Sequence, residues 1–328
     1  MFFDNEERIK NINNERNKYI EEAMELYGHK TCDSSFLNTD DYQNLNLDFV
    51  KNNKLIVRNF DLKPRSTKFI RSQANKILVN QTGSLDRKLL YISDDEKVVY
   101  DYIAKYGEVD EASFNHFVEY LKNYAKKIEV TKIPILWYRD NYRNARSCIY
   151  SLFSDKIPDC RKKFPIISTK IVMSNQNDDL AISVLVHEMV HALVDRNKGI
   201  VENIFHDEVL SIYFEFVAAY EADPTGKLLN VAQLNRLQYL KMPILQRNLQ
   251  VFNGEIPTDD NYIISSLYAF DLFEKYRQAS NKVRNSINQE LNKTFSGKRT
   301  LESTLERLDV SEKAGCEIIR DKVKTLMK

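Results

Sequence analysis

The run His187-Glu188-Met189-Val190-His191 is the feature that most constrains this chain. Two histidines four residues apart on a helix lie on the same face, one turn from each other. At that spacing two imidazole nitrogens can bind one zinc ion at about 2.0–2.1 Å. Glu188 follows the first histidine, where its carboxylate can act as a general base that takes a proton from water. The motif therefore predicts a zinc (Zn²⁺) site with its own catalytic base.

The residues around this motif are apolar, Leu185-Val186 before it and Ala192-Leu193-Val194 after it. Such a segment is typical of a helix that packs within a core. A glutamate buried between two histidines is costly unless a metal ion or strong partners compensate it. The alternative is two core histidines and an unrelated glutamate, since chance alone produces this pattern in roughly one such chain in a hundred.

A catalytic zinc site needs a third protein ligand and one open position. Position 197 is Asn, so the third histidine of a metzincin is missing. We therefore expect a glutamate from the next helix, and we favour Glu215, 24 residues after His191. Small residues share its helix face and would allow the two helices to approach closely. They are Ser211, Ala218, Ala219 and Ala222.

Other residues of the same region are alternative ligands. Glu208 lies two turns before Glu215 on nearly the same stripe, although the helix dipole also favours an acid in a first turn. Glu221 is a further candidate, and for His206 a loop or capping role is favoured over ligation. Asp195, one turn beyond the metal motif, could accept a ring N–H or pair with a neighbouring base.

The apolar patterns of the whole chain predict an α+β fold that is mostly α-helical. Residues 28–65 are rich in Asn and Asp, which indicates loops and short elements. Three runs rich in Ile, Tyr, Phe and Val predict strands, at Ile133–Arg139, Arg146–Phe153 and Ile166–Met173. Helices are expected over 4–27, 66–128, 178–199, 207–222, 227–250, 259–280, 300–308 and 312–327.

The texture of the sequence changes near residue 131. We expect a mainly helical N-terminal region over 1–130 and a catalytic domain over 131–328. The length of 328 residues suffices for one large domain or two ordinary ones.

Charge and hydropathy exclude several classes of protein. Acidic and basic residues nearly cancel, with a formal net charge of +1, so the concentrated basic excess of a nucleic-acid binder is missing. No apolar run approaches the roughly 18 residues that span a bilayer, and the N-terminus lacks the apolar core of a signal peptide. The four cysteines form no CxxC pair. We therefore expect a cytoplasmic protein with reduced thiols, binding neither nucleic acid nor membrane, with leaderless export left open.

Several segments, in chain order, carry a resemblance to a known family. They are the strand region from Cys148 to Asn175, the motif preceded by Leu185-Val186, the stretch Ser211–Glu221, the stretch Asn261–Ala269 and the tail after Phe295. Together, over about residues 146–328, they resemble oligoendopeptidase F and its thimet-oligopeptidase relatives. These are HExxH zinc peptidases of the gluzincin group that act on oligopeptides.

The resemblance implies a short form of a zincin-like catalytic domain, with a small antiparallel sheet and a C-terminal helical part. It implies that Glu215 is the third zinc ligand. The hydroxyl of Tyr262 would donate a hydrogen bond to the transition state, with Tyr268 as the alternative. The partner implied is a peptide or protein substrate, which the strand near 166–173 could bind along a free edge.

Two other functions stay open. No histidine follows His206, and the N-terminal region is short for the family. These departures motivate a non-catalytic, zinc-stabilised interaction protein. They also motivate a dedicated protease with one protein target, such as a component of a phage, toxin or regulatory system.

Overall fold

The computed structural model describes residues 34–51, 62–82, 92–93, 133–138, 146–149, 169–174, 178–196, 200–255, 257 and 259–327. The chain divides into two compact units. The helical unit comprises Met1–Asp61 and Gly199–Lys328, and the sheet unit comprises Leu62–Lys198. The chain thus passes from one unit to the other twice, whereas its texture had suggested a single boundary near residue 130.

The sheet unit contains four described strands in the order β1-β2-β4-β3. Their bounds are Ile92–Ser93 for β1, Ile133–Tyr138 for β2, Arg146–Ile149 for β3 and Thr169–Ser174 for β4. β2 is parallel to both β1 and β4, and only β3 runs antiparallel to β4. The sheet is therefore mixed rather than antiparallel. β4 is paired on both sides, so its edge is not free to bind a peptide, and β3 is the edge strand there.

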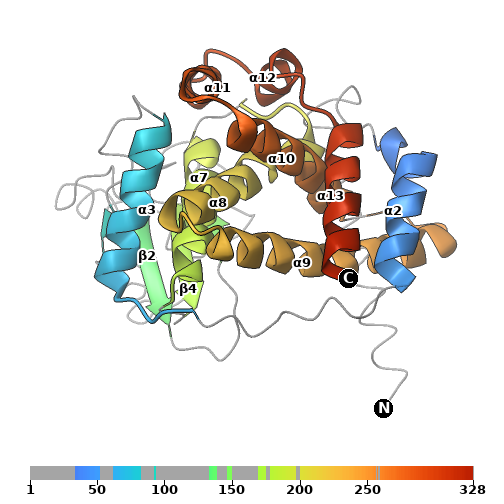
Figure 1. The fold of residues 1–328 in the computed structure, drawn as a ribbon, viewed down its shortest axis with the longest axis horizontal. Coiled ribbons are helices and arrows are strands. Elements are labelled where there is room, and N and C mark those ends of the chain that lie inside the picture. The colour runs from blue at the N-terminus through green and yellow to red at the C-terminus, as the bar shows by residue number, and fades with distance from the viewer. Residues whose placement is uncertain are drawn as a thin grey trace, which may run out of the picture. The chain divides into compact units, whose positions relative to one another are not determined.

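Two helices of the sheet unit pack together, α3 (Thr67–Thr82) and α7 (Leu180–Arg196), and α7 also contacts β3 and β4. Apolar residues recur at helical spacing on α3, where Ile70, Ala74 and Leu78 are fully buried. α7 is apolar along most of its length, as is typical of a helix enclosed by a core. Figure 1 shows α3, α7 and the neighbouring strands β2 and β4.

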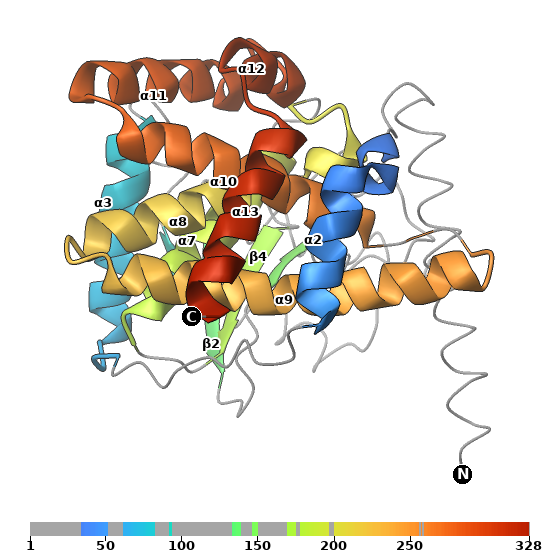
Figure 2. The same cartoon turned by 45° about the vertical axis from the view of Figure 1, so that its right-hand side comes forward.

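The described part of the helical unit contains no strand. Its longer helices are α2 (Asp40–Lys51), α8 (Val209–Ala222), α9 (Lys227–Phe252), α10 (Asp260–Gln278), α11 (Asn281–Phe295), α12 (Leu301–Arg307) and α13 (Glu312–Met327), with short 3₁₀ turns η2 (Ser35–Asn38) and η4 (Ile204–His206). In Figure 2, α11 and α12 lie on one side of α10 and α9 lies on the other. The protein as described is mainly helical, as its sequence predicts.

α8 is the most enclosed element of the helical unit. Every residue from Val209 to Ala219 is buried, and α8 packs against α9 and α10. Its aromatic side chains meet those of α10 edge to face, with Phe216 4.8 Å from Phe270 and 5.6 Å from Phe273 between ring centroids. Such pairs add about 0.5–1.5 kcal/mol beyond their buried area. α8 is thus a rigid support for any polar side chain that it carries.

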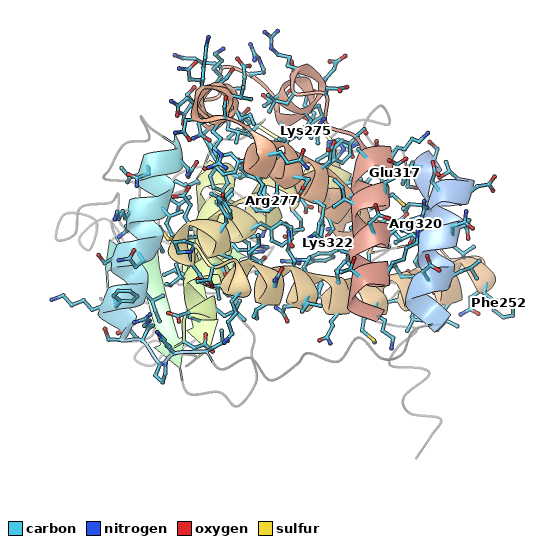
Figure 3. All side chains as sticks on the ribbon, viewed as in Figure 1. Phe252, Lys275, Arg277, Glu317, Arg320 and Lys322 are labelled. Carbon is cyan, nitrogen blue, oxygen red and sulfur yellow. The ribbon has the colours of Figure 1, made fainter. Side chains whose placement is uncertain are left out.

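α13 is joined to α2 by polar contacts in addition to apolar packing (Figure 1). The Arg320 guanidinium donates to the carbonyl oxygen of Asp41 at 2.6 Å, and the Cys316 thiol donates to the same oxygen at 3.3 Å. Figure 3 shows Arg320 between the two helices. Burial raises the pKa of Cys316 to about 11, so this cysteine stays a thiol at neutral pH. The expected reduced, structural role fits this residue.

Most of the described helices were predicted from the sequence, and two of them were not. Six helices begin and end within two residues of their predicted bounds, except that α7 ends three residues early. They are α7, α8, α9, α10, α12 and α13. α11 was not predicted, and α2 occupies a segment where loops were expected. The helix expected over 4–27 lies outside the described residues. Among the described helices, none is both long and apolar enough to cross a bilayer.

Gly315 permits a close crossing of α13 over α10. A Cβ atom at this position would lie 1.9 Å from the carbonyl oxygen of Leu267 and 2.5 Å from its carbonyl carbon. Both are backbone atoms, so neither can move aside without shifting a helix. Only glycine allows this approach.

We predict that Gly315→Ala destabilises the helical unit by about 1–3 kcal/mol, as overpacking does. Chemical denaturation followed by far-ultraviolet circular dichroism measures this change. Glu317→Ala, an exposed substitution on the same helix, is the matched control and should be nearly neutral. A Gly315→Ala variant that is more stable, by the roughly 1 kcal/mol that alanine gains over glycine in a helix, would contradict the close crossing.

Arg247 of α9 and Asp260 of α10 form a buried ion pair, in which Arg247 Nε donates to Asp260 Oδ1 at 2.9 Å. Burial raises the pKa of Asp260 from its ordinary value of 3.8 to about 6, although Arg247 opposes the rise. The folded-state pKa therefore lies above the unfolded-state value. Protonation of Asp260 then stabilises the fold at low pH, and this stabilisation is lost as the pH rises through about 6.

We predict that Asp260→Asn removes a fall in stability, on the order of 2–3 kcal/mol, that the parent protein shows between about pH 4 and 6. Denaturant midpoints measured across this window test it. Asp321→Asn, on the exposed face of α13, should leave the parent's pH dependence in place. The same pH profile for Asp260→Asn and the parent protein would refute the assignment.

Candidate functional site

α7 begins where the sequence predicts it. The Asp178 carboxylate accepts from the backbone N–H of Ala181 at 3.2 Å, which caps one of the unsatisfied donors of the first turn. No proline or glycine interrupts the helix before it ends at Arg196. The metal motif lies in its middle, so both histidines have regular helical geometry. The side chain of Asp195, which could accept a ring N–H or pair with a neighbouring base, lies outside those that the structure describes.

His187 and His191 bring their ring nitrogens together on one face of α7. Their Nε2 atoms are 3.1 Å apart, and the ring centroids are 4.8 Å apart at an interplanar angle of 75°. His187 is buried and His191 is half-buried. Two nitrogens at about 2.05 Å from a tetrahedral zinc ion would be separated by about 3.3 Å. The pair as folded therefore fits two ligand positions of zinc with almost no movement.

Glu188 is buried, with 5 % of its surface exposed. It follows the first histidine of the pair on α7, and its sequence neighbours Met189 and Val190 are fully buried. A buried carboxylate keeps its charge only where hydrogen-bond donors or a cation compensate the lost hydration. Its place directly after the first histidine is the one that the motif requires of a general base.

In the helical unit, α8 carries both carboxylates that were considered as a third ligand. Glu208 is the N-cap residue of α8 and Glu215 lies two turns further on, and they are 7 % and 3 % exposed. The Glu208 side chain makes no capping hydrogen bond to its own helix. A capping hydrogen bond therefore does not explain an acid here, whereas the helix dipole still favours one at this end of α8. Its backbone N–H instead donates to the Ser265 hydroxyl at 3.2 Å.

Glu215 forms a buried ion pair with Arg236 of α9. Arg236 Nη2 donates to Glu215 Oε2 at 2.7 Å, and both side chains are largely buried. The charges of Glu215 and Glu208 outweigh the effect of burial and raise the pKa of Arg236. Arg236 was not predicted as a partner of Glu215, because helical spacing within α9 does not reveal which carboxylate of α8 it meets. Glu215 thus has a strong structural partner within its own unit.

The two tyrosines considered as hydroxyl donors lie in different surroundings. Tyr262 packs edge to face on Tyr239, with ring centroids 5.5 Å apart, and its pKa is raised by burial and by the charge of Glu208. It therefore stays protonated and can donate a hydrogen bond. Tyr268 packs on the ring of His206 at 4.6 Å. Of the two, Tyr262 is the one that shares an electrostatic environment with Glu208.

His206 has a partner that lies 96 residues away in the sequence. Its Nδ1 atom is 3.1 Å from Oε1 of Glu302, at the start of α12. Glu302 also accepts from the backbone N–H groups of Glu202 and Asn203, at 3.0–3.2 Å. The loop role expected for His206 agrees with these contacts, and the part of Glu302 was missed.

Comparisons with known proteins add nothing to this geometry. No protein-family model, no curated protein and no solved structure matches the chain. The resemblance to the oligopeptidase family therefore stays a prediction that rests on the residues quoted for it.

We predict that Arg236→Met lowers the free energy of unfolding by about 3 kcal/mol, because it removes the ion-pair partner of a buried carboxylate. Chemical denaturation in the presence of a chelator measures this loss. The double variant Arg236→Met/Glu215→Gln should cost clearly less than the sum of the two single variants.

The control is the ion pair of Arg277 with Glu274 on α10, labelled at Arg277 in Figure 3, where the arginine side chain is 44 % exposed. Arg277→Ala should cost less than about 1 kcal/mol. Similar costs for Arg236→Met and Arg277→Ala, or strictly additive single variants at 236 and 215, would show that the buried pair is not coupled as described.

Proposed function

We propose that the protein is a zinc-dependent peptidase in which His187 and His191 provide two of the metal ligands and Glu188 is the general base. The observation that carries this proposal is the pair of Nε2 atoms 3.1 Å apart on α7, with a buried glutamate between the two histidines in sequence. Zinc suits this donor set of imidazole nitrogens with a carboxylate.

The third ligand is proposed to come from α8, and two carboxylates compete for that role. Glu215 was favoured from the sequence, but its ion pair with Arg236 gives it a structural task. Glu208 is buried, does not cap its own helix and raises the pKa of Tyr262 by its charge. We therefore favour Glu208, and Glu215 is the alternative.

The chemistry follows from the groups that the chain supplies. A bound zinc ion supplies Lewis acidity, which polarises a carbonyl and makes water more acidic. Glu188 takes a proton from the attacking water and delivers it to the leaving amine. Tyr262, kept protonated by burial, donates a hydrogen bond to the oxygen that gains negative charge.

The proposed substrate is a peptide or protein segment in extended form. β3 is the edge strand beside β4 in the described sheet, so its backbone could pair with such a segment. A mainly helical chain with a sheet beneath the metal helix is consistent with the zincin-like, oligoendopeptidase-like architecture that we propose. The cytoplasm, as expected from the composition, is the proposed location.

We predict that Glu188→Gln retains zinc but loses peptidase activity by about 10²–10⁴-fold, because the general base is removed while the two imidazoles remain. A quenched-fluorescence peptide library, assayed with and without chelator, measures the activity, and metal analysis measures the zinc. Glu317→Gln, an exposed substitution (Figure 3), should match the parent protein. Full activity in the metal-loaded Glu188→Gln variant would remove this mechanism.

We predict that Glu208→Gln weakens zinc binding by more than about 100-fold, beyond the range expected for an outer partner of a ligand, whereas Glu215→Gln weakens it by about tenfold or less. Competition with a chromophoric chelator gives both affinities under the same conditions. The reverse order would assign the third ligand to Glu215. Unchanged affinity in both variants would exclude α8 as the source of a ligand.

A further inference from the structure

A pocket of about 510 Å³ lies within the helical unit, lined by residues of the η4 segment, α10 and α12. This volume falls in the range of small-molecule and side-chain binding sites, about 300–1,000 Å³. The proposed hydrolytic chemistry uses none of the residues that line it. It therefore calls for an explanation of its own.

The charged residues that line the pocket are all acidic. Glu202 and Glu306 are exposed, and Glu302 is half-buried. No lysine or arginine is among the lining residues. Burial opposes ionisation of Glu302, but hydrogen bonds from His206 and from the backbone lower its pKa below the ordinary value. Glu302 thus contributes a negative charge to the pocket at neutral pH.

His206 gives the pocket a buried polar side chain, which is 8 % exposed. Its Nδ1 atom faces the Glu302 carboxylate at 3.1 Å. An ionised carboxylate can only accept, so Nδ1 carries a hydrogen, and in the neutral form of the ring Nε2 is the acceptor. His206 lines the pocket. In its neutral form, the ring nitrogen that does not contact Glu302 could accept a hydrogen bond from an N–H group of a ligand.

The remaining lining residues complement an aliphatic chain that ends in a cation. Leu305 and Val310 are buried and contribute apolar surface. Tyr268 adds an aromatic ring, held edge to face on His206 at 4.6 Å. Apolar surface suits the methylene stem of lysine or arginine, and an aromatic ring attracts the charged head group.

We propose that this pocket binds the side chain of a lysine or arginine residue in a polypeptide ligand. Its acceptors are the carboxylates of Glu202, Glu302 and Glu306 together with His206. Asp207 alone separates His206 from Glu208 in the sequence. A preference for substrates with basic residues rests on the proposed function. Binding of the basic side chain to the pocket does not depend on that function.

The test measures binding of N-acetyl-arginine amide and N-acetyl-lysine amide to the full chain by NMR titration in the presence of a chelator. N-acetyl-norleucine amide, which has an apolar side chain without the cation, is the comparison ligand. The variant Glu202→Gln/Glu306→Gln removes two charges at the pocket and leaves the contacts of Glu302 in place. The matched control Glu317→Gln/Asp321→Asn removes two exposed charges from α13.

We expect the basic ligands to bind more tightly than the norleucine ligand, and the pocket variant to bind them at least about fivefold more weakly than the control variant. Equal binding of all three ligands, or equal binding by the two variants, would overturn the proposal. Because the titration needs no metal ion, its result is independent of hydrolysis. Selective arginine binding without peptidase activity would leave the pocket assigned and refute the proposed function, and activity without selective binding would do the reverse.

Discussion

Two imidazole nitrogens lie 3.1 Å apart on a largely buried face of α7, and the proposed metal site depends on them. Two neutral rings at this distance can share one hydrogen, and two protonated rings would repel each other. A bound divalent cation would satisfy both nitrogen lone pairs at once. The spacing needs no rearrangement, because a regular helix places residues i and i+4 one above the other. The arrangement of the two histidines therefore follows from regular helical geometry alone.

The helical unit contributes rigidity and an organised set of charges. α8 is buried over eleven consecutive residues, and edge-to-face aromatic contacts fix it against α10. Two buried acids of this unit form ion pairs, Glu215 with Arg236 and Asp260 with Arg247. Such pairs contribute little net stability but are costly to break, so they define where each side chain lies. His206 is held against Glu302 in the same way, by a contact between side chains of distant segments.

The sequence was informative where one short segment decides the outcome. The cap at Asp178 and the apolar run behind it were enough to define α7 and the face that carries both histidines. It was less informative about α11, whose buried Ile287, Leu291 and Phe295 recur every four residues. Several asparagines and charged residues between them obscured this pattern, which a stricter count of helical spacing would have found.

Contacts between distant segments could not be read from the sequence. The sheet was expected to be antiparallel, but strand direction depends on connections rather than on the composition of each strand. Arg236 and Glu302 each act on a residue of another helix or turn, and no local pattern marks such a partner. For the same reason Glu215 looked like the better ligand, since its ion pair was not visible.

Zinc K-edge X-ray absorption of the purified full chain, combined with metal analysis, measures directly whether His187 and His191 bind zinc. We predict one zinc ion per chain, with two imidazole nitrogens at about 2.0–2.1 Å and the remaining positions filled by oxygen. The variant His187→Ala/His191→Ala should bind no zinc at this site. A parent protein that binds no zinc, or a spectrum with no imidazole scattering, would reduce the motif to two histidines in a core.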